Sequence, residues 1–343
     1  MRLIERVWFK RDPARLWLVP LLFPLTILFW LVSAIRRSIF RLFPPANDKV
    51  SVPVVIVGNI GVGGNGKTPL TVFIVEQLKA KGLKPGVVSR GYGGKAESYP
   101  CVVNQESTAA QVGDEPLLIH QRCNVPVVVG PDRVAATQQL AEQGCDIVIA
   151  DDGLQHYKLP RAYEIIVVDG KRLFGNGLLL PAGPLREGTW RLDTVDAIVI
   201  NGGAKAFNEC SSNLIINPMK LTAHSLVNVK TNEKLAISEF IEKNKYVNAI
   251  AGIGDPERFF STLTQLNFSL DKKQGFVDHQ AYNVEDFNEF SSEKALLMTE
   301  KDAVKCRHFA QDNWWYLPVD AAFEGKEAEQ LINQVAQLVE QPK

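Results

Sequence analysis

A run of consecutive residues from Gly61 to Thr68 has the types and the order that bind a nucleotide polyphosphate. It reads Gly-Val-Gly-Gly-Asn-Gly-Lys-Thr and fits the P-loop pattern G-x-x-x-x-G-K-[ST]. Glycines let backbone N–H groups converge on phosphate oxygens, and a following helix N-terminus adds its positive dipole end. Lys67 would then reach the β- and γ-phosphates, and Thr68 would ligate Mg²⁺. The residues expected to bind ATP are Gly61, Val62, Gly63, Gly64, Asn65, Gly66, Lys67 and Thr68.

Two carboxylates follow an apolar run farther along the chain. Residues 147–150 read Ile-Val-Ile-Ala and precede Asp151 and Asp152. This pattern is typical of a Walker-B strand, whose tip places an acid beside the P-loop magnesium. Which of the two aspartates touches the metal stays open. Gln155 and His156 continue the same segment, so we expect their side chains to face the same crevice and the substrate.

Two loops rich in glycine or proline are candidates for recognition. The segment Ser89-Arg90-Gly91-Tyr92-Gly93-Gly94 follows a strand, so Arg90 and Tyr92 can mould to a ligand, although a flexible turn has the same composition. The segment 181–187 is stiffer and ends in Arg186 and Glu187. Arg186 can clamp a phosphate and Glu187 can reach Mg²⁺, although a surface ion pair is the simpler interpretation of these two residues alone. The candidate metal ligands are therefore Thr68, Asp151, Asp152 and Glu187.

Two further polar residues have ordinary interpretations when taken alone. Asp114 lies in Val-Gly-Asp-Glu-Pro, where Pro116 opens a helix, and an aspartate at that place is usually a helix cap. His279 lies in a polar loop, and a lone loop histidine is usually a solvated surface residue. Neither residue indicates catalysis by its neighbours in the sequence.

The elements that must position these residues form an α/β pattern. Short runs rich in Val and Ile, without polar alternation, are typical of strands buried on both faces of a parallel sheet. Helical patterns lie between several of them, at 71–81 and 133–143. We expect a P-loop NTPase-like, doubly wound, mostly parallel sheet, with ligands beyond the carboxyl ends of its strands. The expected strands are 54–57, 86–89, 125–129, 147–150, 165–168 and 197–200.

A second, smaller α/β domain is expected after this sheet. Alternating polar and apolar residues at 217–234, with Asn-Glu as a turn, predict a two-stranded antiparallel hairpin that links the domains. Strands are expected at 247–251, 295–299 and 315–317, and helices at 258–266 and 326–340, the last of which can pack on either domain. The predicted division is 1–43, an N-terminal membrane-associated segment; 44–216, the P-loop domain; 217–236, the linker; and 237–343, the smaller domain.

The N-terminal segment is the most apolar part of the chain. Residues 16–35 carry no charge, have Trp17 and Trp30 near the two ends, and are flanked by arginines on both sides. This predicts membrane attachment. We do not expect a cleaved signal peptide, because no small-residue cleavage site follows this segment. A buried core helix is also disfavoured, by Pro20, Pro24 and the flanking basic residues. A helix that spans the membrane and one that lies in the leaflet both stay open.

Composition restricts the remaining classes. Lys+Arg and Asp+Glu both number 38 in 343 residues, so no net field indicates a nucleic-acid partner. The 5 cysteines are scattered and form no C-x-x-C pair, which favours reduced thiols in a cytosolic protein over disulfides or a zinc site. No obligate protein partner is inferred. The cysteines are Cys101, Cys123, Cys145, Cys210 and Cys306.

The motifs taken in order resemble those of the lipid A disaccharide 4′-kinases, the tetraacyldisaccharide 4′-kinase family. The resemblance covers nearly the whole chain, including its apolar N-terminal segment, and it is carried by GNIGVGGNGKT, SRGYGG, VGDEP, DDGLQH, LLPAGPLRE, GIGDPERF, DH…Y and TEKDAVK. It implies transfer of the γ-phosphate of ATP, with Mg²⁺, to the 4′-hydroxyl of a tetraacyl glucosamine disaccharide 1-phosphate. The implied location is the cytoplasmic face of a bacterial inner membrane, on its anionic leaflet.

The resemblance also changes the interpretation of Asp114 and His279. It implies that Asp114 accepts the proton of the sugar hydroxyl and that His279 tunes this carboxylate from the second domain, so that activity depends on domain closure. Asp152 and Glu187 are similar to the family's magnesium-side acids, with Asp151 and Gln155 close by.

Two other functional classes compete with a lipid kinase. A membrane-associated P-loop NTPase switch carries a Lys just before its Gly-Gly pair, where this chain has Val62. A structural or transport subunit that uses ATP remotely has no need of the SRGYGG segment or of Asp114 with His279. Hydrolysis of ATP without lipid distinguishes a switch from a kinase that requires its acceptor.

Overall fold

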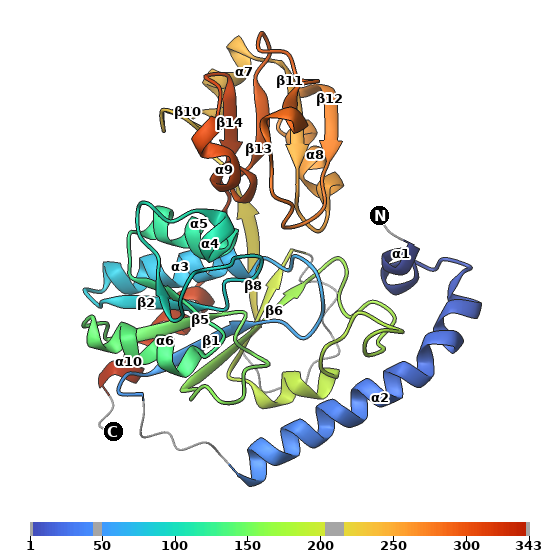
Figure 1. Ribbon diagram of the computed structural model, residues 1–343, viewed down its shortest axis with the longest axis vertical. Helices are drawn as coiled ribbons and strands as arrows, with labels where there is room; N and C mark the ends of the chain where they lie inside the picture. Colours follow the sequence, from blue (N-terminus) through green and yellow to red (C-terminus); the bar gives the residue numbers. More distant parts are fainter. Residues whose placement is uncertain (1–2, 44–49, 203–215, 341–343) are drawn as a thin grey trace.

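The computed structural model describes residues 3–43, 50–202 and 216–340. Two β-sheets, each with its own helices, follow an N-terminal helical segment (Figure 1). The α/β class with a mostly parallel sheet is therefore confirmed. Residues 44–49 and 203–215, which include Cys210 and parts of the predicted P-loop domain, lie outside the described residues, and the other four cysteines are free.

The first sheet has nine strands in the order β15-β8-β7-β6-β1-β5-β2-β4-β3. Strands from β8 to β4 run parallel, and the two edge strands are antiparallel. The carboxyl ends of β1 and β5 are neighbours, which is where ligands bind in sheets of this type. The strands are β1 (Val54–Gly58), β2 (Pro85–Ser89), β3 (Cys101–Val102), β4 (Val127–Val129), β5 (Ile147–Asp151), β6 (Tyr163–Asp169), β7 (Ala197–Asn201), β8 (Ile216–Thr222) and β15 (Asp320–Phe323).

Both faces of this sheet are buried, because successive strand residues enter two different cores. Val55 and Val57 of β1 pack into one core, whereas Val54 and Ile56 pack into the other. Helices α3 (Lys67–Ala80), α5 (Asp114–Cys123) and α10 (Glu327–Glu340) contribute to the first core, and α6 (Arg133–Glu142) to the second. The short α4 (Ala109–Val112) precedes α5.

The second sheet has six strands in the order β10-β9-β14-β13-β11-β12 and lies in the upper domain of Figure 1. Its strands from β14 to β12 are parallel. Apolar residues on its two faces form two further cores. The elements are β9 (Ser225–Asn228), β10 (Lys234–Ala236), α7 (Ile237–Lys243), β11 (Tyr246–Ala251), α8 (Pro256–Gln265), β12 (Ser269–Gly275), β13 (Leu296–Thr299), α9 (Glu300–Cys306) and β14 (Trp314–Leu317).

The predicted hairpin at 217–234 is only partly present. Strand β8 pairs with β7 and β15 in the first sheet, and only the later residues form an antiparallel pair, β9 with β10, around a turn at Asn232. The prediction of one linking hairpin was wrong because a strand near the edge of a sheet alternates polar and apolar residues just as a hairpin does. The chain also returns to the first sheet through β15, and α10 packs against α3.

The N-terminal segment forms α1 (Leu3–Phe9) and α2 (Arg15–Leu42). Among the described residues, α2 is the one helix long and apolar enough to cross a membrane, and only 6% of its most apolar window is buried. It runs beside the first domain (Figure 1). Helix α2 continues through Pro20 and Pro24, because a proline removes one donor and leaves the other helix bonds in place.

Candidate active site

The P-loop lies between β1 and α3, with its shape fixed by glycines and by one asparagine. Gly63 and Gly66 adopt φ values of 106° and 93°, which side chains rarely allow. Asn201, at the end of β7, donates from Nδ2 to the Asn65 carbonyl at 3.1 Å. A Cβ on Gly66 would lie 2.5 Å from that nitrogen, so only glycine fits there. Lys67 and Thr68 follow in the first turn of α3.

Two aspartates stand at the carboxyl end of β5, next to this loop. Lys67 Nζ lies 3.5 Å from Asp152, and Arg186 Nη1 lies 3.2 Å from the same carboxylate. Burial alone would raise the pKa of Asp152, but these two cations hold it below its usual value. Asp151 accepts a hydrogen bond from Thr71 at 3.3 Å, and burial followed by repulsion from Glu115 raises its pKa.

These residues fit a magnesium ion better than a metal that needs many protein ligands. No group of three or more His, Cys, Asp or Glu side chains within the described ranges has metal-site geometry. Mg²⁺ commonly binds through one or two carboxylates together with substrate phosphates and water. Asp151 Oδ2 is buried without a hydrogen-bond partner, which is the state expected of an oxygen kept for a cation. Asp151, Asp152 and Thr68 are therefore the residues that could hold Mg²⁺.

Glu187 contacts other protein side chains and not the aspartates at the end of β5. Its Oε1 accepts from Gln155 Nε2 at 2.9 Å, and its Oε2 lies 3.3 Å from Arg191 Nε. Gln155 also donates to the Asn59 carbonyl at 3.1 Å, just before the P-loop. The predicted metal ligand Glu187 and the predicted substrate residue Gln155 thus share one buried network beneath the P-loop.

The segment that carries Arg186 lies directly against the P-loop. The Val62 N–H donates to the Pro184 carbonyl at 2.9 Å, and the Arg186 N–H donates to the Ile60 carbonyl at 2.7 Å. This places the Arg186 guanidinium beside Asp152, where it can bind a phosphate of the nucleotide. His156 is less available: burial and then Arg133 lower its pKa to about 4, so it is neutral near pH 7.

Arg133 also lies at this site, although its position was not predicted from the sequence. It is buried at the start of α6 and donates to the Asp152 carbonyl at 2.8 Å. Its nearest charges include Asp152, Asp151 and the exposed Arg90. The sequence feature that could have indicated Arg133 is Gly-Pro-Asp-Arg, directly after β4. Asp132 caps α6, so the residue after it lies at the same edge of the sheet.

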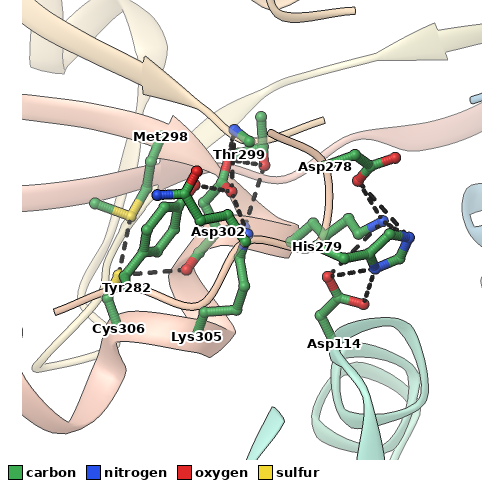
Figure 2. Close-up of polar contacts among 12 residues, drawn as sticks. Asp114, Asp278, His279, Tyr282, Met298, Thr299, Asp302, Lys305 and Cys306 are labelled. Atoms are coloured by element: carbon green, nitrogen blue, oxygen red, sulfur yellow. Dashed lines mark hydrogen bonds and ion pairs between the residues drawn. The ribbon is translucent and has the colours of Figure 1, made fainter. Parts of the chain in front are cut away.

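Asp114 and His279 meet across the domain boundary, although 165 residues separate them in the sequence. His279 Nδ1 lies 3.1 Å from both carboxylate oxygens, and Figure 2 shows the imidazole facing the Asp114 carboxylate. Burial would raise the pKa of Asp114, but its bond with His279 and the charge of Lys301 lower it. Burial would lower the pKa of His279, yet the bond to Asp114 raises it. The two groups therefore stabilise each other's charged forms.

The SRGYGG segment helps to place this pair. Tyr92 sets its ring edgewise to His279, with 4.9 Å between centroids. A Cβ on Gly94 would lie 2.5 Å from the Gly113 nitrogen, and Gly113 itself has a φ of 89°. The SRGYGG and VGDEP loops therefore touch backbone to backbone, and this contact fixes the start of α5, where Asp114 stands.

The loop at 252–256 joins the dyad to the P-loop. A Cβ built on Gly254 would lie 3.7 Å from the Gly64 nitrogen and 3.7 Å from Asp278 Oδ2. Arg172 forms an ion pair with Asp255, and Arg258 forms another with Asp169 at 2.8 Å. The dyad and the phosphate-binding loop consequently belong to one site built from both domains.

The chain closely matches proteins of one family. The family model described as tetraacyldisaccharide-1-P 4′-kinase matches residues 18–337. A tetraacyldisaccharide 4′-kinase of Colwellia psychrerythraea is 54% identical over 334 residues, 97% of each chain, and one of Vibrio cholerae is 48% identical over 338 residues, 98% of this chain and 97% of that one. The crystal structure of LpxK from Aquifex aeolicus in complex with ATP superimposes with a TM-score of 0.78 at 28% identity, covering 94% of this chain and 99% of that one.

Proposed function

The chain belongs to the tetraacyldisaccharide-1-P 4′-kinase family, and from this premise we propose that it phosphorylates the 4′-hydroxyl of a tetraacyl glucosamine disaccharide 1-phosphate with ATP. The protein is then a lipid kinase of lipid A biosynthesis, and its product is the bis-phosphorylated precursor. The observation that carries this proposal is the Asp114–His279 pair beside a complete P-loop, because it adds a proton acceptor to a phosphate-binding site.

The cations around the P-loop support the role of phosphate binding. Lys67 and the glycines of the loop would hold the β- and γ-phosphates, while Arg186 and the buried Arg133 neutralise charge at the carboxyl ends of β1 and β5. Phosphoryl transfer needs chiefly alignment and charge neutralisation, which these fixed groups supply. Two exposed residues of the SRGYGG segment are proposed to contact the disaccharide: Tyr92, whose ring lies beside His279, and Arg90, whose charge acts on Arg133.

The dyad would accept the proton of the sugar hydroxyl. A sugar hydroxyl is a poor nucleophile near neutral pH, and a positioned base contributes about 10²–10⁴-fold to such reactions. As the 4′-oxygen bonds to the γ-phosphorus and the bond to the departing ADP breaks, the hydroxyl proton passes to the Asp114 carboxylate. His279 holds that carboxylate in place through Nδ1.

Asp151, Asp152 and Thr68 are the residues proposed to hold Mg²⁺, with Glu187 behind them. The ion would neutralise charge on the phosphate oxygens when bound with ATP. Asp151 supplies a buried carboxylate oxygen with no hydrogen-bond partner, and Asp152 is kept ionised by Lys67 and Arg186.

We further propose that α2 lies in the cytoplasmic leaflet of the inner membrane rather than across it. Thr26, near the middle of α2, accepts from the Ala182 N–H at 3.0 Å, so the backbone of an irregular loop contacts the centre of the helix. A spanning helix would carry that loop into hydrocarbon, where its backbone groups find no water. At the far end, Arg36 donates to the Gln155 carbonyl at 3.2 Å, which ties the helix directly to the site. An in-plane helix would therefore hold the site at the surface from which the acylated substrate comes.

A mixed-micelle assay with γ-labelled ATP, Mg²⁺ and tetraacyldisaccharide 1-phosphate tests the activity. Wild-type protein should produce labelled bis-phosphorylated lipid, and Asp114→Asn should lower the rate by about 10²–10⁴-fold without loss of ATP binding. Asp312→Asn is the matched control, since Asp312 is an exposed carboxylate of the second domain, paired with Lys230. Folded, ATP-binding protein that labels no lipid would overturn the proposal and favour an NTPase switch.

A further inference from the structure

Lys301 occupies the side of His279 that faces away from Asp114. Its Nζ lies 3.3 Å from His279 Nε2 and 3.0 Å from Asp278 Oδ1. The same nitrogen lies 3.1 Å from Glu115 Oε1 and 3.8 Å from Asp114 Oδ2. Its side chain is only 15% exposed. This lysine therefore contacts both members of the dyad and the two carboxylates next to them in the sequence.

We propose that Lys301 is a positioning residue that selects the Nδ1–H tautomer of His279 and so reserves Asp114 as the proton acceptor. This inference rests on the proposed kinase function, and it names a residue outside the Asp–His pair. Lys301 itself touches no substrate in this proposal.

The chemistry of the contacts leaves one consistent arrangement of protons. An ammonium group has three donors and no acceptor, so when the imidazole is neutral His279 Nε2 must present its lone pair to Lys301. A neutral imidazole then carries its proton on Nδ1, which faces the Asp114 carboxylate at 3.1 Å. The opposite tautomer would set donor against donor at Nε2 and lone pair against carboxylate at Nδ1. Two contacts thus fix one tautomer.

The charges around Lys301 keep it protonated. Burial opposes its charge, but Glu115, Asp114 and Asp278 outweigh this and raise the pKa of Lys301. Lys301 in turn lowers the pKa of Asp114 and works against protonation of His279. The charged groups that face His279 are Asp114, Asp278 and Lys301, and those that act on Asp114 are His279, Lys301 and Lys305.

The elements that carry Lys301 and Asp114 are fixed to each other. Helix α9 packs against α5, and Arg122 of α5 donates to Glu300 of α9 at 2.7 Å. The loop that bears His279 is anchored to the same helix α9, because Tyr282 donates to the buried Asp302 at 2.8 Å (Figure 2). The Asp302 carboxylate also accepts from the Gly252 N–H. His279 is thereby held between two groups whose positions the α5–α9 contact sets.

This arrangement gives the two residues of the dyad different roles. Because Nε2 is capped by Lys301, His279 has no free nitrogen for the sugar hydroxyl. Asp114 Oδ1 already accepts from the Glu115 N–H at 3.0 Å, which leaves Oδ2 as the oxygen with more capacity. The hydroxyl proton therefore passes to Asp114, and His279 keeps its own proton on Nδ1 throughout the transfer.

Imidazole NMR of the full-length wild-type protein in detergent tests the tautomer without any substitution at Lys301. The chain has 5 histidines, so ¹⁵N-histidine labelling with a His279→Gln spectrum assigns the signal. At a pH where the ring is neutral, the expected result is a single Nδ1–H tautomer. An Nε2–H tautomer would overturn the inference even if the protein were fully active as a kinase. A protein without kinase activity but with the Nδ1–H tautomer would instead count against the proposed function alone.

Substitution of Lys301 tests the cause of the tautomer. Lys301→Met should mix the two tautomers and move the acid limb of kcat/KM upward by about one pH unit, because a cation that favours the ionised Asp114 is lost. Lys301→Arg should retain the wild-type pH profile, since the charge remains. Lys294→Met, which removes a lysine paired with Asp271 on the surface, is the control. If Lys301→Met lowered activity but left the tautomer and the pH profile unchanged, the residue would be merely structural.

Discussion

At the scale of residues, the dyad joins two groups whose charged forms support each other. The pKa of Asp114 is lowered and that of His279 is raised, in both cases through their mutual contact against the effect of burial. The stabilisation from Asp114 is present above its unfolded pKa of about 3.9 and is lost as pH falls through the folded value. The stabilisation from His279 is present below its unfolded pKa of about 6.5 and is lost as pH rises through the folded value.

These signs predict a window of pH in which the pair contributes most to stability. Both contributions are present between about pH 4 and pH 6.5. We expect His279→Gln to lower the Tm by about 2–4 °C at pH 5.5, as a loss of about 1 kcal/mol would, and by less at pH 9. Thermal unfolding of both proteins at the two pH values measures this. A difference that grew toward pH 9 would contradict the assignment of charge.

At the scale of elements, α2 has a narrow packed stripe and a broad apolar face. Thr26 and Phe40 contact the first domain, and Arg37 stacks on Trp190 at 5.0 Å. Large apolar side chains cover the remainder of the helix and are exposed, among them Leu25 and Leu28 at 54% and 56%. An exposed apolar surface of this extent, rimmed by arginines, is typical of a helix that lies in a membrane interface.

Charges on this face should release the protein from lipid. The double variant Leu25→Glu/Leu28→Glu loses two apolar contacts worth about 1.5–3 kcal/mol each, so binding to anionic liposomes should fall at least tenfold. Flotation with vesicles measures the binding, and ATP binding in solution should be unchanged. Val284→Glu, at a 50% exposed apolar position of the second domain, is the matched control. Equal binding by the double variant and the wild type would exclude this face as the anchor.

At the scale of the whole molecule, the site exists only where the two domains meet. Asp169 ends β6 of the first sheet and pairs with Arg258 of α8, while Arg172 pairs with Asp255 at the same boundary. These pairs hold the loop at 252–256 beside the P-loop, and that loop also adjoins the residue before His279. We therefore expect domain contact to position the P-loop and the dyad together.

Loss of one pair across this boundary should reduce turnover more than it reduces stability. We expect Arg258→Gln to lower kcat/KM for ATP by about tenfold, the effect of one charged hydrogen bond of about 1.5 kcal/mol. Lys273→Gln is the control, because Lys273 pairs with Glu257 inside the second domain. Steady-state kinetics at saturating lipid compare the two variants. The same loss in both would show that closure does not depend on this pair.

The sequence by itself determined the features that consecutive residues create. A P-loop binds phosphate through successive backbone N–H groups, so Gly61–Thr68 could be recognised from order alone, and so could the buried β1 and β5 beside it. The α/β class and the apolar N-terminal helix followed from periodicity and composition for the same reason. The pairing of β8 could not be predicted in this way. Alternation of polar and apolar residues indicates that a strand has two different faces, but it does not indicate which strand it pairs with.

Only the tertiary structure decided which distant side chains meet. Asp114 taken alone indicates a helix cap and His279 a surface loop, and only the resemblance to a known family joined them. Nothing in the sequence placed Lys301 behind the imidazole, because that contact depends on how the loop of His279 packs on α9 through Tyr282 and Asp302. Charges separated along the chain act on each other through distance in space, and domain packing sets that distance.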